Sequence, residues 1–275
     1  MRIDSHQHFW SYNPVEYPWI KPEWPIRRSF LPEALAVEMN SCQIDGCVAV
    51  QARQTLAESE WLLELADHSP FIKGVVGWVD LRSPDVAVQL NRFATHPKFV
   101  GVRHVVQDEP DDNYMLDTHF QRGISQLRKF ELKYDLLIFP RQLPAASKLA
   151  SAFPEQPFVL DHIAKPPIKD GALDPWRGQL QKLATLPNVC CKVSGLITEA
   201  DWTSWHPKHF KPYLDVVFES FGPDRVMFGS DWPVALLAGT YQQVFELVRD
   251  YVATLGAGVE DAFFGRNAVN FYQFS

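Results

Sequence analysis

The sequence predicts an α/β fold, a (β/α)8 barrel of the TIM type that forms one domain over residues 1–275. The first observation is a series of eight short apolar runs, at residues 2–8, 46–52, 73–80, 99–106, 134–140, 157–162, 188–195 and 225–231. Several are apolar almost throughout, as expected for strands of a parallel sheet that is buried on both faces. Amphipathic stretches separate the runs, and this alternation over 275 residues fits an eight-stranded barrel.

A doubly wound open sheet is the main alternative fold. Such sheets usually carry a glycine-rich turn after the first strand, whereas this chain has Phe9, Trp10, Ser11 and Tyr12 at that place. No internal repeat, low-complexity tract or linker divides the chain. We therefore favour the barrel and a single domain.

Helix-start signals support the alternation. Pro32 opens an amphipathic stretch, and Ser83-Pro84 and Asp174-Pro175 each predict an N-cap residue followed by proline at the first helical position. Further helices are expected at Pro207–Phe221, 240–255 and 259–272.

The segment 9–30 is too long for a routine connection between a strand and a helix. It contains three tryptophans, two tyrosines and four prolines. Prolines stiffen a loop, and aromatic rings allow it to pack without regular secondary structure. Two interpretations remain open: a loop that only stabilises the barrel, or a lid whose rings stack on the apolar face of a ligand.

Composition excludes several classes of protein. Hydrophobic residues make up 46% and charged residues 21% of the chain, which indicates a folded globular protein. The net charge of −7 lacks the basic field that nucleic-acid binding requires. There is no signal-peptide core and no apolar segment of membrane-spanning length. The four cysteines have no zinc or disulfide spacing, so we expect a cytoplasmic protein with a small-molecule partner and no membrane partner.

The first strand ends in the triplet His6-Gln7-His8. Side chains two positions apart on a strand point the same way, so the two imidazoles are expected side by side. Neutral imidazoles placed in this way can bind a metal ion or polarise a carbonyl group. Taken alone, the triplet could equally be two polar residues at a strand end.

The other strand ends favour a functional role for the two histidines, because the carboxyl ends of all barrel strands meet at one mouth. Polar or ionisable residues end at least six of the eight apolar strands. They are Gln51 and Arg53, Trp78 and Asp80, Arg103 and His104, Arg141, Asp161 and His162 with Lys165 after them, Lys192 and Ser194, and Asp231 followed by Trp232. A barrel without a function has no reason to place them there, so we expect a catalytic site.

The residue that ends the last strand is the expected base. An apolar strand that stops at Asp231 gives the carboxylate rigid support, and partial desolvation should raise its basicity. Because Arg103, Arg141, Lys165 and Lys192 all fall near strand ends, we also expect a locally positive mouth.

Four segments together resemble the amidohydrolase superfamily, and more narrowly its lactonase branch of L-fuconolactonase-like and 2-pyrone-4,6-dicarboxylate lactonase-like enzymes. They are Asp4 to Trp10, Gly101 to His104, Leu160 to Pro166 and Phe228 to Pro233, and they extend from the first strand to the last. The resemblance implies an amidohydrolase-like barrel that hydrolyses a carbonyl compound. It also implies that His6, His8 and His162 are catalytic histidines and that Asp231 takes a proton from the attacking water.

The chain departs from the family pattern in ways that bear on metal binding. Many amidohydrolases bridge two metals with a lysine or glutamate on strand four and place a histidine on strand five. This chain offers Arg103 and His104 on strand four and no histidine on strand five. We therefore expect either one divalent ion, Zn²⁺ by preference, on His6, His8 and Asp231, or a metal-independent enzyme.

The predicted activity is hydrolysis of a lactone. On the resemblance, the substrate is a sugar-derived 1,4-lactone of the L-fucono-, L-rhamnono- or galactono-lactone type. We expect Gln51, Trp78, Arg103, His104, Arg141, Lys165 and Trp232 to bind it. The alternatives are a pyrone dicarboxylate lactonase, a metal-dependent decarboxylase of a related branch, and a binding protein without catalysis.

Overall fold

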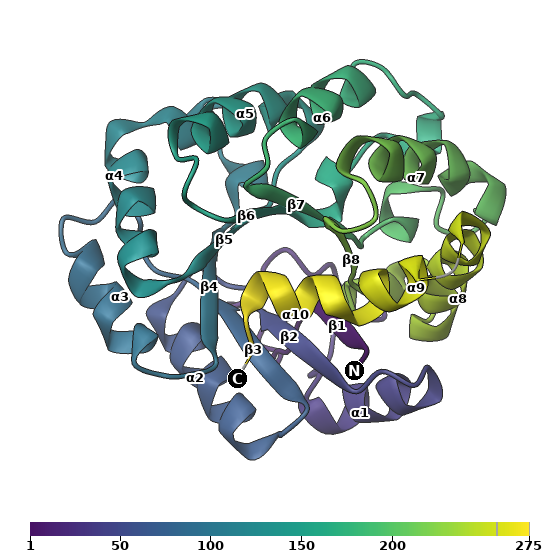
Figure 1. Cartoon of the computed structure of the whole chain (residues 1–275). Helices are drawn as coiled ribbons and strands as arrows, with labels where there is room; N and C mark the ends of the chain where they lie inside the picture. The colour runs from purple at the N-terminus through teal and green to yellow at the C-terminus, as the bar shows by residue number, and fades with distance from the viewer. Residues whose placement is uncertain (257, 275) are drawn as a thin grey trace.

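The fold is a barrel of eight parallel strands, as the computed structural model shows for residues 1–256 and 258–274. Neighbouring strands pair in sequence order from β1 to β8 (Figure 1). The strands are β1 Ile3–Gln7, β2 Gly46–Val50, β3 Ile72–Gly77, β4 Phe99–His104, β5 Lys133–Leu136, β6 Phe158–Leu160, β7 Val189–Val193 and β8 Val226–Phe228. The predicted barrel is confirmed, with strands shorter than the apolar runs.

The last strand returns to the first at the carboxyl end of the barrel. The backbone N–H of Asp231 donates to the carbonyl of His6 at 2.8 Å, and that of His8 donates to the carbonyl of Trp232 at 2.7 Å. These bonds join the end of β1 and the residue after it to the segment that follows β8. They hold the residues that carry the functional side chains in register with each other.

Helices surround the barrel. They are α1 Pro32–Ser41, α2 Leu56–His68, α3 Val86–Ala94, α4 Thr118–Leu127, α5 Leu143–Ala152, α6 Trp176–Ala184, α7 Pro207–Phe221, α8 Tyr241–Val252, α9 Val259–Asp261 and α10 Asn267–Tyr272. The helix predicted at Pro207–Phe221 is confirmed, and Thr240 caps α8 by accepting from the N–H of Gln243. α9 and α10 flank a π-helical segment, Ala262–Arg266, within the predicted 259–272 helix.

Two predicted helix starts were wrong by one or two residues. α3 begins after Asp85, because Ser83 accepts a hydrogen bond from the N–H of Asp85 and so shapes the turn before the helix. α6 begins at Trp176, with Pro175 in the cap position instead of the first helical position. In both cases the proline belongs to the turn that leads into the helix.

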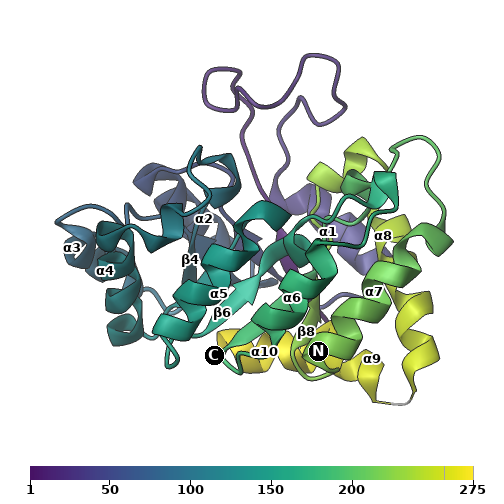
Figure 2. The same cartoon turned by 90° about the horizontal axis from the view of Figure 1, so that it is seen from above.

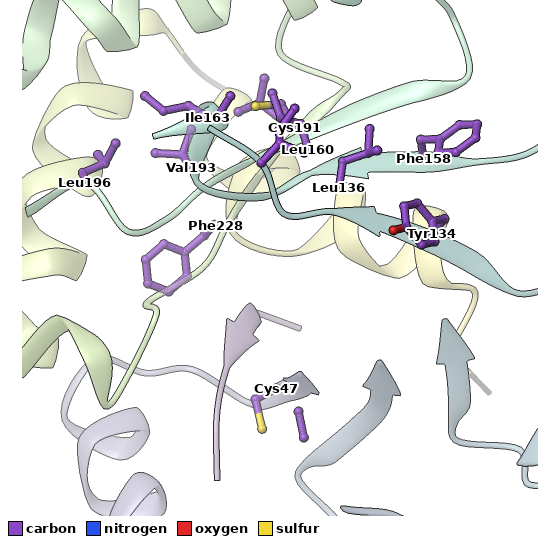
Figure 3. Close-up of a cluster of buried hydrophobic side chains, with 14 of the residues drawn as sticks. Cys47, Tyr134, Leu136, Phe158, Leu160, Ile163, Cys191, Val193, Leu196 and Phe228 are labelled. Carbon is purple, nitrogen blue, oxygen red and sulfur yellow. The ribbon is translucent and has the colours of Figure 1, made fainter. Parts of the chain in front are cut away.

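The core has two layers, which is why the strands are apolar on both faces. The outer layer packs the barrel wall against the helices, and Figure 3 shows part of it from β5, β6 and β7, including Leu136, Leu160 and Val193. The inner layer consists of Ile3, Val48, Val50, Val76, Val100, Val159 and Met227, with Ala268 and Tyr272 from α10. α10 crosses the barrel in the view of Figure 1, so the inner core lies against this helix.

The segment 9–30 stands out from one side of the molecule in Figure 2, opposite α10 and both chain termini. An antiparallel bridge between Trp10 and Phe30 closes its base. The Trp10 indole donates to the carbonyl of Arg28 at 2.8 Å, and Arg27 donates to the hydroxyl of Tyr12 at 2.9 Å. Internal hydrogen bonds therefore shape this loop without strands or helices.

Two further observations concern membrane-spanning helices and the cysteines. Over residues 1–256 and 258–274, no helix combines the length and apolarity needed to cross a membrane. All four cysteines are free thiols.

Candidate active site

Three imidazoles surround one carboxylate at the carboxyl end of the barrel. His8 Nε2 lies 3.4 Å from Asp231 Oδ1, and the Nε2 atoms of His6 and His162 each lie 4.0 Å from it. His6 and His8 face each other with 3.2 Å between their Nε2 atoms. All four side chains are buried. The structure thus brings together the four residues that the sequence predicted as catalytic.

The backbone at Asp231 aims this carboxylate. Its φ of +56° lies in the left-handed region, which Asp tolerates better than most residues. The N–H of the same residue is bonded to His6. The left-handed turn at the end of β8 therefore directs the side chain back over the mouth toward the imidazoles.

His162 and Lys165 stand on a left-handed turn after β6. His162, Ile163, Ala164 and Lys165 have φ values of +54°, +49°, +61° and +50°. Each such residue costs about 1–2 kcal/mol relative to a right-handed conformation. The buried indole of Trp176 donates to the carbonyl of Ile163 at 2.8 Å and holds the turn. Strain of this kind, supported by packing, is typical of functional sites.

Hydrogen-bond partners assign the protons on His8 and His162. Nδ1 of His8 donates to the carbonyl of Val50 at 2.8 Å, so a neutral His8 keeps a lone pair on Nε2. The hydroxyl oxygen of Ser194 accepts from the backbone N–H of His162 at 3.3 Å, and the same hydroxyl can donate to the ring atom Nδ1 of His162 at 2.9 Å. A neutral His162 then carries its proton on Nε2, the atom that faces Asp231.

A network of buried charges fixes His6. Its Nδ1 lies 3.2 Å from Asp161 Oδ1 and 3.2 Å from the ammonium of Lys192. Lys192 also contacts Asp135 and lies 3.1 Å from Asp161, while Arg103 lies 3.1 Å from Asp161 and 3.2 Å from His6 Nε2. A neutral His6 therefore donates to Asp161 and accepts from Arg103.

The pKa shifts follow from burial and from these neighbours. Burial lowers the pKa of His6 and of His162 well below the usual value for an imidazole, so both are neutral at pH 7. Burial also acts to raise the pKa of Asp231, but His162, His8 and Lys165 more than offset it and the pKa is lowered. The expected rise in the basicity of Asp231 was wrong, because the sequence does not show how closely positive and hydrogen-bonding groups approach this carboxylate.

The donor atoms fit one metal ion. With neutral imidazoles, His8 Nε2 and Asp231 Oδ1 offer electron pairs to an ion, and His6 Nε2 does so when the ion replaces its hydrogen bond from Arg103. The three atoms lie within 4.8 Å of one another. Two imidazoles and a carboxylate suit Zn²⁺. A second set, His6, Asp161 and His162, lies within the same limit. However, Asp161 is already bonded to Arg103, and this cation beside His6 opposes a second ion.

His8, His162 and Asp231 line a cavity of about 770 Å³. The segment 9–30 contributes Trp10, Val15, Glu16, Trp19 and Trp24 to its walls. Other lining residues follow the strands: Arg53, Gln54 and Thr55 after β2, Gln107 and Asp108 after β4, and Thr198, Glu199 and Trp202 after β7. The volume suits a small organic molecule.

Comparison with known proteins supports a family for this chain. Residues 3–274 match the model of a family described as amidohydrolase. The chain is 41% identical to an L-fucono-1,5-lactonase of Burkholderia multivorans, over 99% of this chain and 96% of the relative. It is 37% identical to an L-fucono-1,5-lactonase of Burkholderia ambifaria, over 99% of this chain and 95% of that protein.

The chain belongs to the amidohydrolase family. A crystal structure of an amidohydrolase from Burkholderia multivorans with bound zinc superimposes with a TM-score of 0.97 and 41% identity, and the match covers all of both chains. The family and fold that the sequence motifs indicated are thus confirmed over the full barrel.

Of the predicted substrate-binding residues in this amidohydrolase, Arg103 and Lys165 line the cavity. Gln51 is fully buried and accepts from Arg103 at 2.9 Å, so it positions the guanidinium. The structure places the remaining four, Trp78, His104, Arg141 and Trp232, outside the residues that line the cavity.

Strand geometry explains the position of His104. Adjacent residues on an extended chain point to opposite faces, so Arg103 and His104 cannot both enter the cavity. His104 instead accepts from the indole of Trp78 at 3.3 Å and stacks on Tyr114. Trp232, the neighbour of Asp231, packs its ring edge-to-face on Phe30, with 5.1 Å between the ring centroids.

The expectation of a positive mouth needs correction at two residues. Arg141 is 45% exposed and donates to Asp112 at 2.7 Å, outside the cavity. Lys192 is fully buried beneath His6 instead of lying at the mouth. The sequence analysis treated both as strand-end charges, whereas the buried carboxylates on β5 and β6 hold Lys192 inside the barrel.

Sequence reasoning missed Glu199 and Trp202. Both follow β7 in a loop that begins with the 3-10 turn Ile197–Glu199, and both line the cavity. No periodicity indicates the direction of a loop side chain. The one signal available was position, since loops at the carboxyl ends of barrel strands form the active site.

Proposed function

We propose that this enzyme hydrolyses a neutral sugar lactone, with L-fucono-1,5-lactone as the first substrate to test. One observation carries the proposal: an ionised carboxylate, Asp231, lies among three imidazoles in a cavity of about 770 Å³. The relatives at 41% and 37% identity are named for this lactone. The sequence motifs indicate a five-membered 1,4-lactone, so both ring sizes belong in the test.

In the proposed reaction, Asp231 accepts a proton from water as the water oxygen attacks the lactone carbonyl carbon. Its lowered pKa keeps it ionised at neutral pH. A lactone is a more reactive carbonyl compound than an amide, so a weaker base suffices. Asp231 then returns the proton to the ring oxygen as the carbon–oxygen bond breaks, which leaves a hydroxy acid.

The negative charge that develops on the carbonyl oxygen needs donors in the cavity. His162 Nε2–H is the donor that the hydrogen-bond network makes available. Arg103 adds positive charge at the cavity wall, while its guanidinium donates to Gln51, His6 and Asp161. His8 is not such a donor when neutral, because its only proton is bonded to Val50. We therefore assign His8 to metal or water binding, which revises the predicted role for this residue.

His6, His8 and Asp231 would hold a divalent ion, and we propose Zn²⁺. When bound, such an ion polarises a carbonyl oxygen and increases the acidity of water. The free thiols support the further proposal that the enzyme acts in a reducing compartment, the cytoplasm.

The experiment is a panel of 1,4- and 1,5-aldonolactones, with 2-pyrone-4,6-dicarboxylate and an aromatic acid, assayed with and without chelator by a pH indicator. We expect hydrolysis of a neutral sugar lactone well above the spontaneous rate. Asp231→Asn should lower kcat about 10²–10⁴-fold, since it removes the base, while Asp170→Asn on the surface should not. If no lactone reacts faster than without enzyme, the proposal is wrong. Preference for the aromatic acid would favour the decarboxylase.

A further inference from the structure

The basic side chains that line the cavity are each paired with a carboxylate. Three basic residues line it, and each lies near a carboxylate. Arg103 is 3.1 Å from Asp161, Arg53 is 2.8 Å from Glu16 and Lys165 is 3.9 Å from Glu199. Two of these carboxylates, Glu16 and Glu199, line the cavity themselves, together with Asp108 and Asp231. The charges in the cavity walls thus do not favour an anionic ligand.

The pair Lys165–Glu199 differs from the other two pairs in its distance. At 3.9 Å the ammonium and the carboxylate attract each other without forming a hydrogen bond. The two side chains are 19% and 23% exposed, so each retains access to the cavity. The oxygens of Glu199 are therefore open to hydrogen-bond donors of a bound ligand.

Glu199 also lies within the electrostatic influence of the reacting centre. Burial raises its pKa, Lys165 opposes this rise, and the charge of Asp231 adds to it. Because Asp231 and Glu199 line the same cavity, a ligand that fills it meets both carboxylates. Trp202, three residues further along the chain, and Trp24 bring their rings together edge-to-face with 5.8 Å between centroids, and both line the cavity.

A carboxylate accepts hydrogen bonds and cannot donate them when ionised. Neighbouring hydroxyl groups of a sugar satisfy both of its oxygens, whereas a carboxylate on the substrate offers only repulsion. Tryptophan rings beside it suit the C–H face of a sugar ring. The wall formed by Glu199 and Trp202 thus matches a hydroxylated, uncharged ring.

From this geometry we propose that Glu199 is a specificity-determining residue, which binds hydroxyl groups of the lactone and excludes lactones that carry a carboxylate. The inference rests on the proposed lactone hydrolysis and assigns its charge selectivity to one side chain. Glu199 takes no part in proton transfer.

The test compares two substrates that differ only in the terminal group: an aldonolactone, and the aldarolactone in which a carboxylate replaces the terminal CH₂OH. The probe variant is Glu199→Gln, which keeps the size of the side chain and removes its charge. The ratio of kcat/KM for the anionic lactone to that for the neutral one should rise about tenfold. Where anionic turnover is too slow, the inhibition constant of the aldarolactone against the neutral substrate replaces its kcat/KM.

Glu155→Gln is the matched control, because Glu155 is exposed and precedes β6 at the opposite end of the barrel. It makes the same change in net charge and should leave the ratio unchanged. Melting temperatures establish that both variants are folded. A rise of less than threefold for Glu199→Gln, or an equal rise for Glu155→Gln, overturns the inference. If the unmodified enzyme hydrolyses neither lactone, the proposed function itself fails.

Discussion

Replacement of Lys192 by methionine should destabilise the protein in a strongly pH-dependent way. Lys192 is fully buried and its ammonium contacts the carboxylates of Asp135 and Asp161. Without it, Asp161 retains Arg103 at 3.1 Å. Among the described residues, the remaining hydrogen-bond partner of Asp135 is the hydroxyl of Tyr272, at 3.0 Å from one oxygen and 3.2 Å from the other. The unpaired charge therefore falls on Asp135.

The expected loss of unfolding free energy is the smaller of two costs: that of an unpaired buried charge, and that of protonating Asp135. Breaking a buried ion pair by removing one partner costs about 3–5 kcal/mol. Asp135 can avoid this cost by taking up a proton. Burial raises the pKa of Asp135 to about 6 even beside Lys192, so protonation requires about 1.4 kcal/mol for each pH unit above 6. That limit is about 2 kcal/mol at pH 7.5, whereas at pH 5.5 the carboxyl is already mostly protonated in the unmodified protein. The loss should thus be about 2 kcal/mol at pH 7.5, roughly 4 °C in Tm for a chain of this length, and less than about 0.5 kcal/mol at pH 5.5.

Urea unfolding followed by tryptophan fluorescence at both pH values measures this loss, and the chain has nine tryptophans as probes. The double variant Lys192→Met/Asp135→Asn removes the unpaired charge and should recover most of the stability. Lys148→Met on the exposed face of α5 should change the free energy of unfolding by less than about 0.5 kcal/mol. A loss below 1 kcal/mol at pH 7.5, or an equal loss at both pH values, would refute this account of the network.

Three further predictions concern the site and its surroundings. Gly195→Ala places a Cβ 2.6 Å from His162 Nδ1 at a φ of +59°, so kcat should fall at least tenfold. The control Gly171→Ala has a φ of +67° and no atom within 4 Å of the added Cβ, so it should show only the backbone cost of about 1 kcal/mol in stability. Equal activity in the two variants would contradict this prediction. Burial raises the pKa of Glu58 to about 7, so the folded protein binds the carboxyl proton of Glu58 more tightly than the unfolded chain does. The stability that this protonation contributes is complete below pH 4.5 and is lost as pH rises to 7. Glu58→Gln should therefore gain about 2–3 kcal/mol relative to the unmodified protein between pH 5 and 8, and a pH-independent difference in urea unfolding would count against it. Elemental analysis should find at most one divalent ion per chain, because Asp161, the carboxylate of the second ligand set, is already paired with Arg103 and Lys192, and two equivalents would show this to be wrong.

The order of the strands and the main catalytic residues could be predicted from the sequence because both depend on local pattern. Apolar runs marked all eight strands, and alternation along the first strand placed His6 and His8 on one face. The position of Asp231 at the end of the last strand then placed it at the mouth. In a barrel, the end of a strand is sufficient to locate a residue at the active-site face.

Prediction was weaker for residues whose place at a strand end does not decide whether the side chain points into the cavity or away from it. Trp78 and His104 end strands, yet they bond to each other outside the cavity. Arg141 ends a strand as well, but it lies on the surface with Asp112. The loop 9–30 was identified as unusual, and only the structure shows that it contributes three tryptophans to the cavity walls.

The sequence by itself therefore determined the barrel, the family motifs and the chemistry available at the strand ends, because these follow from chain periodicity and residue type. Only the tertiary structure decided how charges pair. Lys192 meets Asp135 across 57 positions of the chain, and Asp135 meets Tyr272 across 137. Whether a charge is buried, what its pKa is and whether it can reach a ligand all depend on such distant partners, whose distances no local pattern contains.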